Sequence, residues 1–384
     1  MNAREKVEVV TFGCRLNIVD SEQLAREQAS DKETIVVNTC AVTSEATRQA
    51  RQAIRRLHRE RPEAEIVVAG CAARIDPQRF AELDGVTRVI EEQPHNHAET
   101  AEEGTRGLLA VQNGCDHSCT FCIIPFGRGA SRSAAPHEVI AQARALVAAG
   151  KKEIVLTGVD LTSYAADGVT LGQLVRRLLD EVPELPRLRL SSIDCIEADE
   201  ALLRAMAEEQ RLCPHLHLSL QAGDDLILKR MKRRHLRDDA IRFCKEMRAA
   251  RPDIVFGADF IAGFPTETED MFAQTLALVD DCGLTHLHVF PFSPRPGTPA
   301  ALMPQVARDI AKARAARLRD AGEAALLRHL DAQHGKTLQF LTERGGAARA
   351  ADFTLARTPG AAAGQVIAAR VTGHDGSALR VEPL

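Results

Sequence analysis

Three cysteines lie close together in one glycine-led segment. Cys115, Cys119 and Cys122 form a C-x3-C-x2-C pattern directly after Gly114. Three thiolates at this spacing can bind three irons of a [4Fe–4S] cluster, and the fourth cysteine of a ferredoxin-type run is missing. The fourth iron would then be free to bind a substrate group. Structural zinc is the alternative, but it normally takes four protein ligands, and His117 lies between the cysteines at an unfavourable spacing.

Three further cysteines, Cys14, Cys40 and Cys71, each follow a short apolar segment in the first hundred residues. Those segments, 7–12, 34–39 and 66–69, are typical of parallel strands that are covered on both faces. Helices are expected between them at 20–29, 44–59 and 77–83. Parallel strands end at one edge of their sheet, where ligands bind. We therefore expect the three thiols to converge, although any one of them alone could be a small buried residue.

The order of expected elements predicts an α/β protein in three parts. Residues 1–93 are expected to form a doubly wound parallel α/β domain. The polar stretch 91–107 is expected to connect it to residues 105–334, and His95 and His97 there are expected to be solvated. Strand and helix alternate six times in that second part, which predicts a partial (β/α)6 barrel. Its expected strands are 109–112, 153–157, 187–191, 215–220, 255–261 and 286–290. A long helix over 305–334 then leads to a small β module at 335–384.

Composition indicates a soluble protein of the cytoplasm. The 384 residues are 45% hydrophobic and 27% charged, with a formal net charge of −4. The apolar runs are too short for a membrane helix, and the N-terminus lacks the apolar stretch of a signal peptide. Ten cysteines in a reducing compartment favour metal binding or catalysis over disulfides. We expect four of them to be structural: Cys195, Cys213, Cys244 and Cys282.

The cysteine motif, with Phe121 before its last cysteine and a (β/α)6 pattern after it, resembles the radical S-adenosylmethionine superfamily. This resemblance implies a catalytic cluster whose open iron binds S-adenosylmethionine, which is cleaved to methionine and a 5′-deoxyadenosyl radical. A preceding α/β domain with a cysteine after each of three strands is similar to the methylthiotransferases. In that family these cysteines, here Cys14, Cys40 and Cys71, hold a second [4Fe–4S] cluster that carries the sulfur to be inserted. The C-terminal module is similar to the family's TRAM RNA-binding domain.

Four segments look like the threonylcarbamoyladenosine tRNA branch of that family: 11–17, 38–43, 157–164 and 292–299. Phe126, where the family has tyrosine, and a shorter helix after Asp20 are departures. The branch implies conversion of N6-threonylcarbamoyladenosine at position 37, in the anticodon stem-loop of tRNA, to its 2-methylthio form. It also implies an electron donor such as flavodoxin or ferredoxin, and a sulfur source. The alternatives are isopentenyladenosine tRNA or ribosomal protein S12 as the substrate, or a non-catalytic protein that binds zinc and RNA.

Two groups of basic residues could bind RNA phosphates. Arg48, Arg51, Arg55 and Arg59 recur at helical spacing, and the segment 229–235 is a second cluster. A solvated helix face is an equally good interpretation of either group alone. Five residues at predicted strand ends are candidates for binding S-adenosylmethionine, although each could instead cap a helix. They are Gly158 and Val159 for the methionyl group, and Ser192, Ser219 and Gln221 for the ribose or carboxylate.

Overall fold

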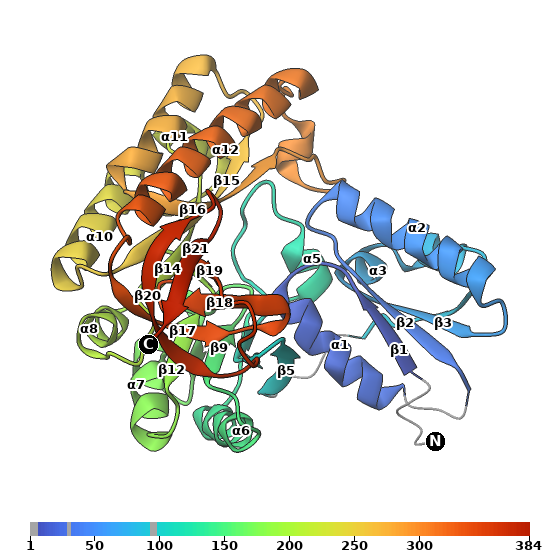
Figure 1. Ribbon diagram of the computed structural model, residues 1–384. Helices are drawn as coiled ribbons and strands as arrows, with labels where there is room; N and C mark the ends of the chain where they lie inside the picture. The colour runs from blue at the N-terminus through green and yellow to red at the C-terminus, as the bar shows by residue number, and fades with distance from the viewer. Residues whose placement is uncertain (1–6, 29–31, 93–97) are drawn as a thin grey trace.

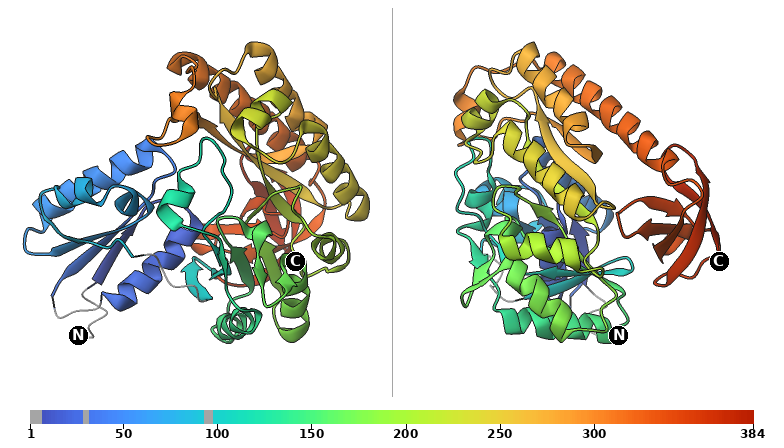
Figure 2. Two further views of the ribbon diagram at one scale, coloured as in Figure 1. Left: turned by 180° about the vertical axis from the view of Figure 1, so that it is seen from behind. Right: turned by 90° about the vertical axis from the view of Figure 1, so that its left-hand side faces the viewer.

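The computed structural model describes residues 7–28, 32–92 and 98–384, and the predictions for His95 and His97 lie outside this range. The described chain contains an N-terminal α/β domain, a central partial barrel and a small C-terminal β-barrel (Figure 1). Figure 2 shows the C-terminal barrel at one side of the molecule, next to the end of the long helix α12 (Arg308–Asp331). Within these residues no helix is long and apolar enough to cross a membrane.

The N-terminal sheet consists of four parallel strands in the order β1-β2-β3-β4. These are β1 (Val7–Thr11), β2 (Thr34–Thr39), β3 (Glu65–Gly70) and β4 (Val86–Val89), and the helices between them are α1 (Arg15–Glu27), α2 (Ser44–Glu60), α3 (Cys71–Ile75) and α4 (Pro77–Ala81). The three predicted strands are confirmed. The sequence analysis missed β4, whose central Thr87 and Arg88 are exposed and interrupt the apolar pattern. It also placed the start of α1 five residues too late, because α1 begins directly after Cys14.

The central domain has six parallel strand positions, which confirms the partial (β/α)6 barrel. Two sheets form it, in the orders β12-β9-β6-β5 and β13-β14-β15-β16. The third parallel strand is split at Ser191 into β12 (Arg187–Leu190) and β13 (Ser192–Ile193), and so contributes to both sheets. The other parallel strands are β6 (Arg106–Ala110), β9 (Glu153–Thr157), β14 (His215–Gln221), β15 (Val255–Ala262) and β16 (Leu284–Pro291), with helices α6 (Pro136–Ala148), α7 (Leu171–Glu181), α8 (Glu200–Glu208), α9 (Asp225–Met231), α10 (Arg237–Ala250) and α11 (Glu269–Asp281).

The stretch predicted to be a connection contains a strand, which corrects that prediction. β5 (Glu99–Glu103) pairs antiparallel with β6 through a turn at Gly104. Charged residues are common on edge strands because they discourage pairing with other chains, so the acids that suggested a linker are compatible with β5. Helix α1 packs against this hairpin, and Leu16 and Val19 share a buried cluster with Ala101 and Leu108. The first two domains therefore share a hydrophobic core.

The C-terminal module is a closed barrel in the order β17-β18-β19-β21-β20. Its strands are β17 (Thr337–Thr342), β18 (Ala347–Ala350), β19 (Leu355–Arg357), β20 (Val366–His374) and β21 (Leu379–Pro383). Arg187 of β12 donates hydrogen bonds to the backbone carbonyls of Gln339 and Arg349, at 2.8 and 3.2 Å. The guanidinium of Arg189 lies 5.1 Å from the ring centre of Phe353, in the turn after β18. The module is thus attached to the central barrel through its backbone and through an aromatic contact.

Candidate functional site

The three N-terminal cysteines lie at the carboxyl ends of neighbouring strands, as expected. Cys14 follows β1 by three residues, and Cys40 and Cys71 come directly after β2 and β3. Cys40 and Cys71 are buried, whereas Cys14 is exposed. The pKa of the Cys40 thiol is raised to about 11, mainly by burial and in addition by the nearby Cys14 and Cys71. The thiols are thus close enough to influence one another, and at neutral pH that of Cys40 is protonated unless a metal binds.

Glycines leave space around these thiols. Gly13 has φ +108°, and a Cβ there would lie 2.8 Å from the Cβ and 2.9 Å from the sulfur of Cys40. Gly70 has φ +93°, and a Cβ there would lie 2.4 Å from the carbonyl oxygen of Thr39. Both positions require backbone conformations that glycine adopts at little cost. The close approach of Gly13 to Cys40 leaves no room for a side chain there, and three thiols at neighbouring strand ends are a donor set that fits a cluster with a vacant corner.

The second cysteine trio lies over the strand ends of the central barrel. Cys115 and Cys119 follow β7 (Gln112–Asn113), and Cys122 precedes helix α5 (Ile124–Arg128). Burial raises the pKa of the Cys115 thiol to about 12 and that of Cys122 to about 11. Arg233 donates a hydrogen bond to the sulfur of Cys119, at 3.8 Å. Like the first trio, this one offers three thiols, and the charge of Arg233 opposes the effect of burial on the pKa of Cys122.

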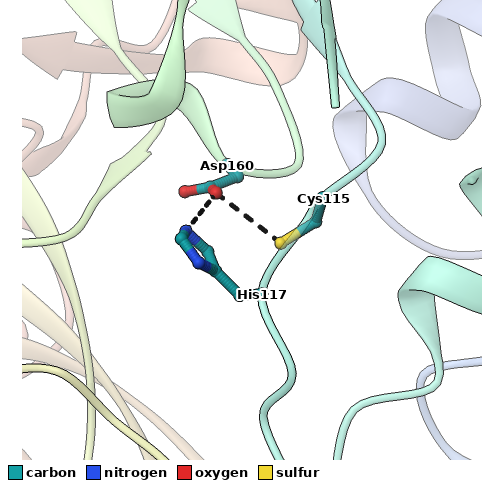
Figure 3. Close-up of side chains that lie close together, drawn as sticks. All are labelled: Cys115, His117 and Asp160. Carbon is teal, nitrogen blue, oxygen red and sulfur yellow. Dashed lines mark hydrogen bonds and ion pairs between the residues drawn. The ribbon is translucent and has the colours of Figure 1, made fainter. Parts of the chain in front are cut away.

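Cys115 is part of a compact group with His117 and Asp160 (Figure 3). The Asp160 Oδ2 lies 2.7 Å from the His117 Nε2 and accepts a hydrogen bond from the Cys115 thiol, at 3.6 Å. The fold of the loop brings the His117 ring to within 4.8 Å of the Cys115 sulfur. The group within 4.8 Å does not include Cys119 or Cys122, so His117 does not complete the trio as a fourth zinc ligand.

A cavity of about 240 Å³ adjoins Cys122 of the second trio and the loop that follows Cys40 of the first trio. Cys122 lines it on one side, and Val42 and Thr43, which follow Cys40, line it on the other. Apolar side chains form most of the remaining wall, and its polar members include Gln221 and Asp259. Gln221 has φ +71°, a strained conformation that is often found at functional sites. The cavity therefore joins the second cysteine site to the loop that follows Cys40, whereas the three cysteines of the first trio are not among its lining residues.

Asp259 is a site residue that the sequence analysis missed. It accepts hydrogen bonds from the His217 Nε2 and the His288 Nδ1, at 3.0 and 3.2 Å. Burial opposes its ionisation, but these two hydrogen bonds outweigh burial and hold the pKa of Asp259 well below its usual value. Gly257 makes room for this arrangement, because a Cβ there would lie 2.6 Å from the His217 Nδ1. An ionised carboxylate is therefore fixed in the wall of the cavity.

Of the five residues predicted to bind S-adenosylmethionine, only Gln221 lines this cavity. Val159 instead packs against the cluster that joins α1 to the central sheet. Gly158 lies against Gln112, since a Cβ at 158 would be 2.9 Å from the Gln112 Oε1. The carbonyl oxygen of Ser219 accepts a hydrogen bond from Arg233, at 2.6 Å. Ser192 begins β13 and is half-buried. The four cysteines predicted to be structural are buried free thiols.

The two predicted basic clusters have different environments. Arg48, Arg51 and Arg55 of α2 line an open groove of about 790 Å³ together with Arg79, Arg295 and one acid, Asp76. Burial and the nearby Arg79 and Arg55 lower the pKa of Arg51, and Asp76 partly offsets them, so the groove has more cations than acids in its lining. Arg59 does not line the groove. In the segment 229–235, by contrast, Arg233 and Arg234 bind Asp194 at 2.7 and 2.8 Å, so two of its cations are already paired, while Lys229 and Lys232 are exposed.

Comparisons with known proteins match two segments of the chain. Residues 109–279 match the Radical SAM superfamily, and residues 6–91 match the Uncharacterized protein family UPF0004. The chain is 45% identical over 377 residues to the threonylcarbamoyladenosine tRNA methylthiotransferase MtaB of Rickettsia prowazekii, covering 90% of each protein. It is 33% identical to the tRNA-2-methylthio-N(6)-dimethylallyladenosine synthase of Cereibacter sphaeroides, covering 100% of this chain and 99% of that protein. The radical S-adenosylmethionine methyltransferase TsrM of Kitasatospora setae has a similar fold, with a TM-score of 0.55, 14% identity, and coverage of 74% of this chain and 69% of TsrM.

Proposed function

Because the chain belongs to the methylthiotransferase family of radical S-adenosylmethionine proteins, we propose that it methylthiolates N6-threonylcarbamoyladenosine at position 37 of tRNA. The greater identity to the threonylcarbamoyladenosine enzyme, 45% against 33% for the dimethylallyladenosine synthase, supports this substrate over the isopentenyl nucleoside. The product would carry a methylthio group at C2 of the adenine.

The observation that carries the proposal is one cavity lined by Cys122 of the second trio and by Val42 and Thr43, which follow Cys40 of the first trio. Replacing a C–H bond of adenine by a C–S bond requires that the radical source and the sulfur donor reach the same carbon. An adenine inserted beside Cys122 would also lie beside the loop that follows Cys40. The base must leave its stack in the anticodon loop to enter, as in other enzymes that act on nucleobases.

The donor sets fit two clusters. Cys115, Cys119 and Cys122 would hold the [4Fe–4S] cluster that binds S-adenosylmethionine, and Cys14, Cys40 and Cys71 would hold the second. When bound, the first cluster supplies the electron for radical formation and the second carries sulfur. The chain's own residues position the reactants. Gln221 and Asp259 present an amide and a carboxylate to the cavity. The Asp259 carboxylate would accept hydrogen bonds from ribose hydroxyls of S-adenosylmethionine, and the Gln221 amide would accept or donate them.

The groove along α2 would bind the RNA backbone. It adjoins the cavity, because Ser44 and Pro294 line the groove, while Thr43 and Ser293 line the cavity. Arginines bind phosphates through bidentate hydrogen bonds, and their attraction to RNA is independent of sequence. The TRAM-like C-terminal barrel would provide a second RNA contact. The reaction also requires a strong reductant, such as flavodoxin or ferredoxin, and a sulfur source, and a tRNA substrate places it in the cytoplasm.

Mass spectrometry of tRNA nucleosides tests the proposal. Cells without the gene should accumulate N6-threonylcarbamoyladenosine and lack its 2-methylthio form, and the intact gene should restore that form whereas a Cys119→Ala copy should not. An unchanged level of the 2-methylthio nucleoside would reject this substrate. Loss of the 2-methylthio isopentenyl nucleoside, or a mass change in ribosomal protein S12, would identify one of the other substrates instead.

A further inference from the structure

A five-residue helix connects the two cysteine sites. Helix α5 begins two residues after Cys122 and packs against α3, which begins at Cys71; the two helices lie side by side in Figure 1. The contact is backbone to backbone at Gly127, where a Cβ would lie 3.1 Å from the Cβ and 3.2 Å from the carbonyl oxygen of Cys71. Arg74 of α3 donates a hydrogen bond to the carbonyl of Gly127, at 3.2 Å. The placement of Cys71 relative to Cys122 is therefore determined largely by α5.

The last residue of α5, Arg128, extends into the N-terminal domain, and its side chain is only 1% exposed. Its Nη2 donates hydrogen bonds to the Oδ1 of Asn17, at 2.5 Å, and to the Oδ2 of Asp20, at 2.8 Å. Its Nη1 donates to the Oδ1 of Asn113, in the strand that precedes the second cysteine trio, at 3.1 Å. One guanidinium thus connects the helix after Cys14 with the segment before Cys115.

Asn17 brings this network to the N-terminal thiols. Its Oδ1 accepts a hydrogen bond from the Cys14 thiol, at 3.8 Å, and its Nδ2 donates to the carbonyl of Thr39, at 3.2 Å, directly before Cys40. Arg128 is also close enough to interact electrostatically with Cys14 and Cys71. It is therefore a buried cation beside the N-terminal trio, with one carboxylate, Asp20, as its ion-pair partner.

The charge balance changes when the cysteines bind metal. Metal binding replaces three neutral thiols by three thiolates, and reduction of a bound cluster adds another negative charge. In a buried region these charges interact strongly with a nearby cation, because little water screens them. In the metal-free protein the buried carboxylate of Asp20 pairs with Arg128. Thiolates formed on metal binding would bring further negative charge, to which the guanidinium is also attracted.

We propose that Arg128 is a positioning residue that fixes the N-terminal cysteine site against Cys122 and stabilises the anionic, metal-loaded form of that site. This inference depends on one part of the proposed function, namely that Cys14, Cys40 and Cys71 bind a cluster. Removal of the charge should weaken iron binding at the N-terminal site and shift its reduction potential to more negative values, because the added electron loses an attractive partner.

The test uses the full chain with Cys119→Ala, so that iron is retained at the N-terminal site alone. Three changes are made in this background: Arg128→Gln, Arg128→Lys and the double change Asp20→Asn with Arg128→Gln. After anaerobic reconstitution, iron and sulfide per chain, the midpoint potential and the unfolding temperature are measured. Arg128→Gln should lose at least half of the iron and show a more negative potential. Arg128→Lys, which keeps the charge, should keep the parent potential.

The double variant separates the role of Arg128 at the cysteines from its ion pair with Asp20. It leaves no unpaired carboxylate, so it should recover much of the unfolding temperature but neither the iron nor the potential. Arg189→Gln is the matched control, since Arg189 is also a 1% exposed arginine bound to a carboxylate, that of Glu153. It should lower the unfolding temperature and leave the potential unchanged.

Wild-type iron content and potential in Arg128→Gln, or their return in the double variant, would overturn the inference. None of these measurements uses tRNA or S-adenosylmethionine. A protein that shows the Arg128 effect and does not modify tRNA would therefore contradict only the proposed function. A Cys119→Ala parent that binds no iron would contradict both.

Discussion

The thiol of Cys115 donates a hydrogen bond to the carboxylate of Asp160, with 3.6 Å between the Sγ and the Oδ2, although 45 residues separate them in sequence. Asp160 lies beyond the end of β9, and Cys115 lies in the loop that carries the second trio. Burial raises the pKa of Cys115 to about 12, and the charge of Asp160 adds to this effect. Asp160 thus holds the proton on one of the thiols that must lose it when metal binds.

We expect Asp160→Asn to make Cys115 more reactive in the metal-free protein. Each unit by which the thiol pKa falls gives about tenfold more thiolate at pH 8, and thiolate is the form that iodoacetamide alkylates. The rate is measured anaerobically by mass spectrometry of the peptide that contains Cys115. Cys122 is the internal control, because its pKa is raised mainly by burial and Asp160 is not among its causes. Equal acceleration at both cysteines would indicate a loosened loop instead.

The metal-free protein should lose stability as the pH rises above 9. The folded-state pKa values of Cys40 and Cys122 are about 11, above the ordinary value of 9.0, so the folded state keeps protons that the unfolded state releases. Stability from these thiols is complete below pH 9 and decreases toward pH 11. Urea unfolding at pH 8, 9 and 10 measures the slope. The iron-loaded protein should lack this slope, since its thiols are no longer protonated, and equal slopes would argue against metal binding at these cysteines.

Single cysteine variants should each lose a different half of the iron. Cys71→Ala removes a ligand of the N-terminal trio, and Cys119→Ala removes one of the second trio. About four irons with matching sulfide should remain in each variant, compared with about eight in the wild type. Cys213→Ala is the control, because Cys213 is a buried thiol apart from both trios, and it should keep the full iron content. One or two zinc ions without sulfide in the wild type would instead support the non-catalytic alternative.

Gly13→Ala should damage the N-terminal site specifically. The new Cβ would lie 2.8 Å from the Cβ of Cys40, at a residue with φ +108°. Gly104→Ala is the matched control, because Gly104 also has positive φ, +62°, but open space around it. Both changes should cost about 1–2 kcal/mol of backbone strain, and only Gly13→Ala should also lose the iron of the first trio. Equal iron contents in the two variants would show that Cys40 can move away.

Arginines of the groove along α2 should contribute to tRNA affinity through charge. Arg55→Ala and Arg79→Ala should each weaken binding similarly for all tRNA sequences and reduce the salt dependence of log K by about one unit of slope. Fluorescence anisotropy at several salt concentrations measures both effects. Arg204→Ala on α8 is the control, since Arg204 is an exposed arginine that pairs with Glu200 at 3.0 Å. An unchanged slope in Arg55→Ala and Arg79→Ala would place the RNA elsewhere.

The sequence predicted the features that depend on local pattern. Apolar runs ending in Cys40 and Cys71 gave the strands, and the topology of parallel sheets then brought the thiols to one edge. Strand β5 was missed because its acids resemble a linker, and only pairing with β6 reveals it.

Contacts between side chains that lie far apart in the sequence could not be predicted. Arg233 and Arg234 resembled an RNA-binding cluster, but both pair with Asp194, from a different strand–helix unit. Asp259 gave no signal, because a single carboxylate in a strand becomes significant only when His217 and His288 surround it. The burial of Arg128 is likewise invisible in a short motif, since it depends on the docking of two domains.

The hydrogen bonds from Arg187 to the backbone of the C-terminal barrel bear on how the enzyme would select one nucleotide of the tRNA. Because carbonyl groups on two of its strands accept these hydrogen bonds, the module is attached to the central barrel at more than one point. A tRNA bound both by this module and along α2 would place in the cavity only the nucleotide that lies at the matching distance from the module. The enzyme would then choose its adenosine by a molecular ruler as well as by the chemistry of the base.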